Sequence, residues 1–492
     1  MLQNLLKDAG ITLFSEFATR FEQTAHRLAE ETGEAQLATA SVSRSSYRRW
    51  LEGKQVPQGK KTTRVLYAMF SVPMKELVGA APAHAPTRTP RCAHRVPLLN
   101  RWNTSEFTTA APASGADSTW WLSPAERGNL FRGVSLTAQL YRARQVNDTL
   151  LLAPEYRSHL RAFVQPANRT VVLAAPESTP GEDIYLLDSG HVRRQLAAEP
   201  PQRQVTLPRS YRLDALTYGI TWALANLDAA LLTDDAALAG EQQELNGRFS
   251  APRSVARTEL PHLSRIGAAW LGSHVCAQHL TRQLQGGRQP PQFWCREQYG
   301  EEAAAALFFR DRHQALEATS RLGAPGTEVG GAFCLPETIV MQGQEYERIL
   351  TFLSLALLER RGITTWVCTD PEYSQVDAVT LLPEHRAIVA NWLRAGGDIW
   401  HVDTVEARPH LRDYAQTLDY VRQHTAVPGS DPAARLRSLA YYLELDWPEL
   451  VVRCRELGQD GVAGLFQPHS RHLTLKELDA VLSFVGGLDP AL

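Results

Sequence analysis

Cysteine is scarce in this chain of 492 residues: six cysteines lie far apart, with no C-x-x-C pair among them. That spacing gives no disulfide framework and no zinc site, so we expect free thiols in a reducing compartment and no bound metal. No apolar run approaches the length of a membrane-spanning helix, and acidic residues interrupt the N-terminus before a signal peptide could form. These absences predict a cytoplasmic protein without a membrane partner.

Neither sign of charge dominates, since 51 Lys and Arg residues stand against 53 Asp and Glu residues for a formal net charge of −2. Any attraction to an acidic partner must therefore be local. Lysine is rare, and five of the six lysines fall within the first 75 residues. The stretch ASVSRSSYRRWLEGKQVPQGKKTTRVL, residues 40–66, gathers seven basic residues against one acid, Glu52. Its basic residues are Arg44, Arg48, Arg49, Lys54, Lys60, Lys61 and Arg64.

Catalytic motifs are missing too. The chain has no P-loop, no G-x-G-x-x-G, no G-x-S-x-G, no H-E-x-x-H and no kinase signature. We therefore expect no enzymatic activity and no cofactor. His274 and His279 are five residues apart rather than the four that a zinc helix needs, so both are expected to be structural.

The pattern of apolar residues predicts a multidomain chain. Residues 1–79 read as short amphipathic helices and predict an all-α N-terminal domain. A Pro-rich linker and loose segment follow over 80–119. Residues 120–425 predict a mixed α/β domain that senses a ligand or binds a partner, and 426–492 predict a helical C-terminal end. Within the α/β domain, strands over 331–338 and 363–370 flank a helix over 345–362, which is typical of a parallel crossover.

The basic stretch has the layout of a helix-turn-helix, in which a second short helix enters the major groove of DNA. Ser43 fits the position before this helix, because its hydroxyl can accept from free amide hydrogens in the first turn. Tyr47, Trp50 and Leu51 recur at helical spacing and predict the inward face. Gly53 ends the helix. The outward positions are Arg44, Ser45, Ser46 and Arg48.

QLATASVSRSSYRRWLEGKQVP followed by VLYAMFSVPMKELVG resembles the Cro/CI-type (XRE family) helix-turn-helix of bacterial transcription regulators. The resemblance covers roughly residues 11–79. It departs from the family pattern at Ser41, where glycine is usual, and at the bulky Tyr47. By this resemblance, base contacts come from Ser43, Arg44, Ser45, Ser46 and Arg48, and phosphate contacts from Lys54, Lys60 and Lys61, with Arg49 also in the predicted DNA-binding set. The resemblance implies double-stranded DNA as the partner and a homodimer that reads two half-sites.

The large domain carries only weak candidates for contact with a small-molecule or protein effector. Asp370 and Glu372 follow a predicted strand, where α/β proteins often place ligand loops. His401 and Asp403 share one face of another predicted strand and could act as a base and its orienting acid, but no nucleophile motif accompanies them. Two alternatives stay open beside a transcription regulator. One is an enzyme that the helix-turn-helix only recruits, and the other is a protein-interaction regulator whose helix-turn-helix is silent.

Overall fold

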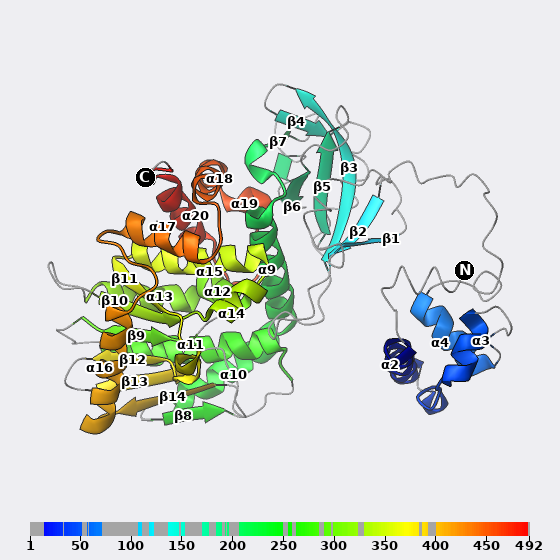
Figure 1. Cartoon of the computed structure of the whole chain (residues 1–492), viewed down its shortest axis with the longest axis horizontal. Helices are drawn as coiled ribbons and strands as arrows, with labels where there is room; N and C mark the ends of the chain where they lie inside the picture. Colours follow the sequence, from blue (N-terminus) through cyan, green and yellow to red (C-terminus); the bar gives the residue numbers. More distant parts are fainter. Residues whose placement is uncertain are drawn as a thin grey trace. The chain divides into compact units, whose positions relative to one another are not determined.

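The chain divides into two compact units, Met1–Ala93 and His94–Leu492, in the computed structural model (Figure 1). The structure describes residues 14–32, 34–51, 57, 59–70, 107–110, 118–122, 136–146, 149–152, 170–176, 184–188, 192, 194–195, 206–248, 254–257, 262–284, 290–296, 299–322, 329–382, 386–391 and 400–490. The sequence predicts a short helix over residues 73–79 and a Pro-rich linker over 80–97, and both lie outside the described residues. No helix in the described ranges is both long enough and apolar enough to cross a bilayer.

The described part of the first unit is helical. Its elements are α2 (Phe14–Thr32), the 3₁₀ turn η1 (Ala35–Leu37), α3 (Arg44–Leu51) and α4 (Lys60–Phe70). Phe17, Phe21 and Ala25 recur every four residues along α2 and are fully buried, so one stripe of this helix forms the core of the unit. The sequence predicts a helix over EAQLATA, and this prediction is wrong beyond the three residues of η1.

The second unit is mixed α/β and contains two sheets. In the first sheet the strand order is β1-β2-β3-β4-β7, with β5 pairing β3 in parallel and β6 pairing β5 antiparallel. Its strands are β1 (Phe107–Ala110), β2 (Ser118–Leu122), β3 (Leu136–Val146), β4 (Thr149–Leu152), β5 (Thr170–Pro176), β6 (Tyr185–Asp188) and β7 (Thr206–Leu207). Strands β5 and β6 confirm the expected β structure over 169–177 and 183–190. The loose segment expected over 104–119 instead contains β1 and the start of β2, which pair antiparallel.

The second sheet has the order β11-β10-β9-β12-β13-β14-β8. Its strands are β8 (Ser254–Arg257), β9 (Gln292–Cys295), β10 (Val329–Cys334), β11 (Ile363–Cys368), β12 (Val379–Leu382), β13 (Arg386–Asn391) and β14 (Trp400–Val405). Strands β9, β10 and β11 are parallel to one another, whereas β12, β13, β14 and β8 pair antiparallel. The crossover predicted from β10 through a helix to β11 is confirmed, because α15 (Glu345–Arg360) connects these parallel strands.

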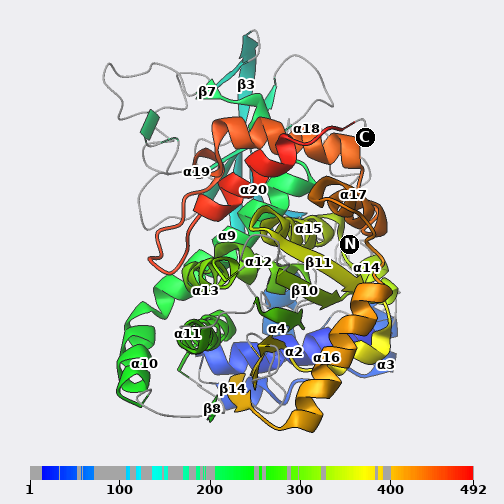
Figure 2. The ribbon, with the colours of Figure 1, turned by 90° about the vertical axis from the view of Figure 1, so that its left-hand side faces the viewer.

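Helices cover both faces of this sheet (Figure 2). Helix α16 (Arg408–Gln423) packs on one face, where Leu411, Leu418 and Val421 share a core with strand residues such as Ala332. The opposite face carries α11 (Arg265–Leu284), α12 (Gly300–Phe308), α13 (Arg310–Ser320) and α15. The remaining elements are η4 (Arg209–Tyr211), α9 (Ala215–Thr233), α10 (Asp235–Arg248), α14 (Glu337–Gln342), η5 (Pro371–Gln375), α17 (Pro432–Tyr442), α18 (Trp447–Asp460), α19 (Val462–Leu465) and α20 (Lys476–Gly486).

One predicted helix is broken in two. The sequence predicts a single helix over residues 301–322, but α12 ends at Phe308 and α13 begins at Arg310. Phe309 between them is extended (φ −72°, ψ 118°), fully buried, and bridged to Leu473. The Arg310 N–H donates to the His472 carbonyl at 3.0 Å. A distant segment thus provides the hydrogen bond that interrupts the helix.

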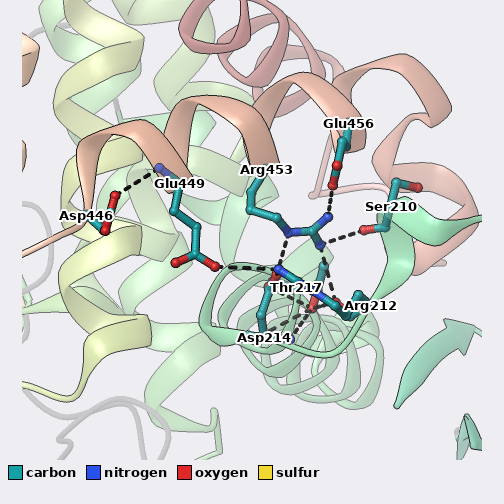
Figure 3. Close-up of polar contacts among 8 residues, drawn as sticks. All are labelled: Ser210, Arg212, Asp214, Thr217, Asp446, Glu449, Arg453 and Glu456. Atoms are coloured by element: carbon teal, nitrogen blue, oxygen red, sulfur yellow. Dashed lines mark hydrogen bonds and ion pairs between the residues drawn. The ribbon is translucent and has the colours of Figure 1, made fainter. Parts of the chain in front are cut away.

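The C-terminal helices pack into the same hydrophobic core as α9 and α15. At this interface, Arg453 of α18 makes several polar contacts (Figure 3). Its side chain is 5% exposed, and its Nε donates to Asp214 Oδ2 at 2.5 Å. Its Nη2 donates to the Ser210 carbonyl at 2.8 Å, and its Nη1 to Glu456. Asp214 also caps α9, since its Oδ1 accepts from the Thr217 N–H at 2.9 Å. One buried guanidinium therefore ties α18 to the start of α9.

Candidate functional site

Helix α3 begins where the sequence places a cap. The Ser46 N–H donates to Ser43 Oγ at 3.2 Å, and the Ser43 hydroxyl donates to Ser46 Oγ at 2.9 Å. The first bond satisfies one of the amide hydrogens that a helix start leaves without a partner. Ser43 is exposed and Ser46 half-buried, so the cap lies at the surface of the first unit.

Two aromatic residues anchor the inner side of α3. Tyr47 and Trp50 are both buried, and the ring of Tyr47 packs 4.6 Å from that of Phe17 and 5.4 Å from that of Phe14. Aromatic pairs at these centroid distances add stability beyond the area they bury. This packing fixes which side of α3 faces α2. The bulky Tyr47 is therefore accommodated by two phenylalanines of α2.

Most of the sequence-predicted DNA-binding cations that the structure describes lie on α3 and at the start of α4. Arg44, Ser45 and Arg48 are helical positions of α3, Lys60 opens α4, and Lys54 lies outside the described residues. Arg49 is exposed. Lys61 is exposed as well and donates to Thr39 Oγ1 at 3.4 Å, while Arg64 pairs with Glu34 at 2.7 Å. The structure thus brings part of the sequence-predicted basic set onto two neighbouring helices.

In the second unit, Asp370 follows β11 at the carboxyl end of the parallel strands, as the sequence predicts. Its Oδ1 accepts from the Glu372 N–H at 3.0 Å and so caps the short turn η5. Glu372 is exposed. The side chain of Asp370 thus has a local structural partner.

His401 and Asp403 lie on β14, and Asp403 Oδ1 accepts from the Thr404 N–H at 2.8 Å. Strands β10, β9, β12 and β13 separate β14 from β11. At about 4.8 Å per strand, the two pairs of candidates lie roughly 24 Å apart. The structure therefore does not bring the four predicted ligand contacts into one site.

His274 is held as a structural residue. Its Nδ1 lies 3.0 Å from Asp311 Oδ2, an Asp–His pair that the sequence does not reveal. The side-chain amides of Gln278 and Gln242 lie 2.9 and 3.3 Å from its Nε2. These contacts from both sides fix the orientation of the imidazole ring.

Three parallel strands end on cysteine, a feature that sequence analysis missed. They are β9 at Cys295, β10 at Cys334 and β11 at Cys368. Cys334 and Cys368 are direct register partners, whereas Cys295 pairs with Phe333. Side chains alternate along a strand, so Cys334 and Cys368 share the face under α16 and Cys295 faces the other way. The available signal was that each of the two strands predicted over 331–338 and 363–370 contains one cysteine.

The two register partners interact through their thiols. Cys334 hydrogen bonds with Cys368, and its Sγ also lies 3.3 Å from the Asp370 carbonyl oxygen. The bond from Cys334, together with a backbone hydrogen bond from Asp370 and the charge of His424, lowers the pKa of Cys368 to about 7 against the opposing effect of burial. The same hydrogen bond, with burial, raises the pKa of Cys334. Cys368 is thus the sulfur that ionises first.

A cavity lies on the opposite face of the sheet, between the strands and helices α12, α13 and α15. It encloses about 80 Å³ and has a mostly apolar lining that includes Phe293, Phe333 and Leu355. Arg312, which is 8% exposed, contributes a cationic side chain to the lining. Thr351 and Ser354 also line the cavity, and each hydroxyl donates to a carbonyl of its own helix, at 3.1 and 2.8 Å. Their hydroxyl oxygens can therefore accept a further hydrogen bond.

Within the described residues, no three His, Cys, Asp or Glu side chains gather in a geometry that could hold a metal ion. Comparison of the chain with protein-family models, with curated proteins and with solved structures found no match in any of the three. The function is therefore inferred from the residues themselves.

Proposed function

We propose that this chain is a sequence-specific DNA-binding transcription regulator whose N-terminal helices read the major groove of double-stranded DNA. The observation that carries the proposal is α3: a short helix that Ser43 caps and that Tyr47 and Trp50 anchor from within. Three further residues of this helix are arginines: Arg44, Arg48 and Arg49. Arginine is the commonest donor to guanine edges in the major groove.

Electrostatics support the same proposal. The whole chain carries a formal charge of −2, yet residues 40–66 carry seven cations and one acid. Lys60 and Lys61 open α4, and Lys61 is exposed. Cations at such positions can neutralise backbone phosphates and release counterions, which holds the protein on DNA without reading its sequence. We further propose a homodimer, since a single unit of this size reads only one half-site.

Selection of bound fragments from genomic DNA by the purified full-length protein, at about 150 mM salt, tests the proposal. We expect enrichment of a motif with two-fold symmetry. Arg44→Ala should reduce the preference for the selected site by about 5- to 150-fold, equivalent to 1–3 kcal/mol. Lys60→Ala should weaken binding to all sequences alike and reduce the salt slope by about one ion.

Arg20→Ala serves as the matched control, because Arg20 is an exposed arginine of the same unit that lies on α2. It should leave the preference for the site unchanged. Lack of enrichment by the native protein would contradict DNA binding. That result would favour the recruited enzyme or the protein-interaction regulator instead.

We propose that the effector is a small apolar molecule with an anionic group and that it binds in the cavity of the second unit. The cavity measures about 80 Å³ and is lined mostly by apolar side chains. An apolar group that fills it would gain van der Waals contacts with this lining and leave water. The volume is about half of the ~150 Å³ that accommodates benzene, so the enclosed part fits a branched aliphatic group. Arg312 is placed to attract a carboxylate.

Thermal unfolding with isovalerate, and with isoamyl alcohol as the uncharged analogue, tests this site. Isovalerate should raise the unfolding temperature more than the alcohol does. Ala315→Leu, which places side-chain carbons at a residue lining the cavity, should abolish the shift. Ala305→Leu is the matched control, since Ala305 is equally buried but does not line the cavity. An equal response from the native protein and Ala315→Leu would refute the site.

A further inference from the structure

Cys334 and Cys368 are placed for a covalent bond to each other. They are 34 positions apart in the sequence, but they are the last residues of adjacent parallel strands and stand in direct register. Neighbouring strands lie about 4.8 Å apart, which falls inside the 4.4–6.8 Å range of Cα separations in disulfides. Both side chains point to the same face of the sheet, under α16.

The positions of the two cysteines distinguish them from the other cysteines that the structure describes. Cys334 and Cys368 are direct register partners on one face of the sheet. Cys295 ends the next strand, but it is one register position off and faces the opposite side. Cys276 and Cys454 are buried within helices α11 and α18. Among the cysteines that the structure describes, Cys334 and Cys368 therefore form one adjacent pair, and the others serve as internal controls.

We propose that Cys334 and Cys368 form a reversible disulfide when the protein meets a hydroperoxide. This modification site goes beyond the proposed DNA-binding function and does not depend on it. Cys368 is the residue that reacts first. It lies on β11, at the edge of the sheet, and the exposed Thr369 follows it directly. Two residues, Thr369 and Asp370, separate Cys368 from the turn η5.

The reaction balances with one peroxide. The thiolate of Cys368 attacks one peroxide oxygen, an S–O bond forms, the O–O bond breaks, and the leaving hydroxide takes up a proton to become water. The sulfur of Cys334 then attacks the sulfenic sulfur of Cys368, so that an S–S bond forms and the S–O bond breaks. The departing hydroxide takes the proton of Cys334 and leaves as a second water. Two thiols are oxidised by two electrons, and the peroxide is reduced.

The product should be readily reduced. Neighbouring strands lie about 4.8 Å apart, whereas the Cβ atoms of a relaxed disulfide lie about 3.8 Å apart. The strand ends must therefore move closer together, and the contact from Cys334 Sγ to the Asp370 carbonyl is lost. Strain of this kind is typical of labile disulfides rather than of structural ones. Since Asp370 caps η5, oxidation should also disturb that surface turn.

Full-length protein treated with hydrogen peroxide, then denatured and alkylated with N-ethylmaleimide, tests the proposal. Intact mass should show two fewer alkylated cysteines and the loss of two hydrogen atoms, and dithiothreitol should reverse both. Peptide mapping should find Cys334 joined to Cys368. Cys295→Ser should form the bond as the native protein does, whereas Cys334→Ser and Cys368→Ser should not.

The native protein decides the outcome even if a variant fails to fold. Full alkylation of both cysteines after peroxide treatment, or conversion to sulfinic acid without a cross-link, would overturn the proposal. A cross-link to any other cysteine would overturn it as well. The readout is covalent, so a failure here is separate from any failure to bind DNA.

Discussion

Replacement of Arg453 gives the sharpest test of how the second unit is held together. The guanidinium of this residue is 5% exposed and contacts Asp214, Glu456 and the Ser210 carbonyl (Figure 3). Removal of one partner from a buried ion pair costs about 3–5 kcal/mol. The lower end of this range applies here, because Asp214 is 20% exposed and keeps Arg212 at 3.9 Å as a second cation. We therefore expect Arg453→Ala to lower the free energy of unfolding of this unit by roughly that amount.

Urea unfolding followed by tryptophan fluorescence measures this loss, with the slope against urea checked for constancy. Arg453→Lys should recover only part of the stability, because one ammonium group cannot make the same fork of hydrogen bonds. Arg471→Ala is the matched control: this arginine pairs with Asp235 at 3.1 Å, but its side chain is 58% exposed. Such surface pairs contribute about 0–1 kcal/mol. Equal effects of Arg453→Ala and Arg471→Ala would refute the reasoning.

Two further predictions concern the same unit. Burial lowers the pKa of His313 to about 4, from the usual 6.5, so the unfolded chain binds its proton first as the pH falls. Stability should therefore decrease between pH 6.5 and 4, by up to about 3 kcal/mol, and a His313→Gln variant should show a flatter pH profile in urea unfolding. Gly330→Ala should destabilise the sheet, because the new Cβ would lie 2.0 Å from the ring of Trp366. Gly240→Ala, where nothing lies within 4 Å, should be neutral or stabilising by up to about 1 kcal/mol in the same assay.

Local patterns predicted the elements well where the chain itself carries the signal. Apolar spacing of three and four residues marks α9, α11 and α15, and runs of β-branched and aromatic residues mark β11 and β14. The cap at Ser43 was predictable because its donor lies three residues away. The break at Phe309 was not, because its cause lies in a segment more than 160 residues further along the chain.

The candidate sites also differ in whether the sequence alone could predict them. The sequence alone placed Tyr47 and Trp50 on the buried side of a capped, arginine-bearing helix, since helical geometry decides which residues share a face. Only the tertiary structure paired Cys334 with Cys368, enclosed the cavity beside Arg312 and set Arg453 against Asp214. These contacts depend on strand order, register and the docking of helices. The spacing of residues along the chain does not predict these contacts, because each contact depends on which surfaces of the helices and strands pack together.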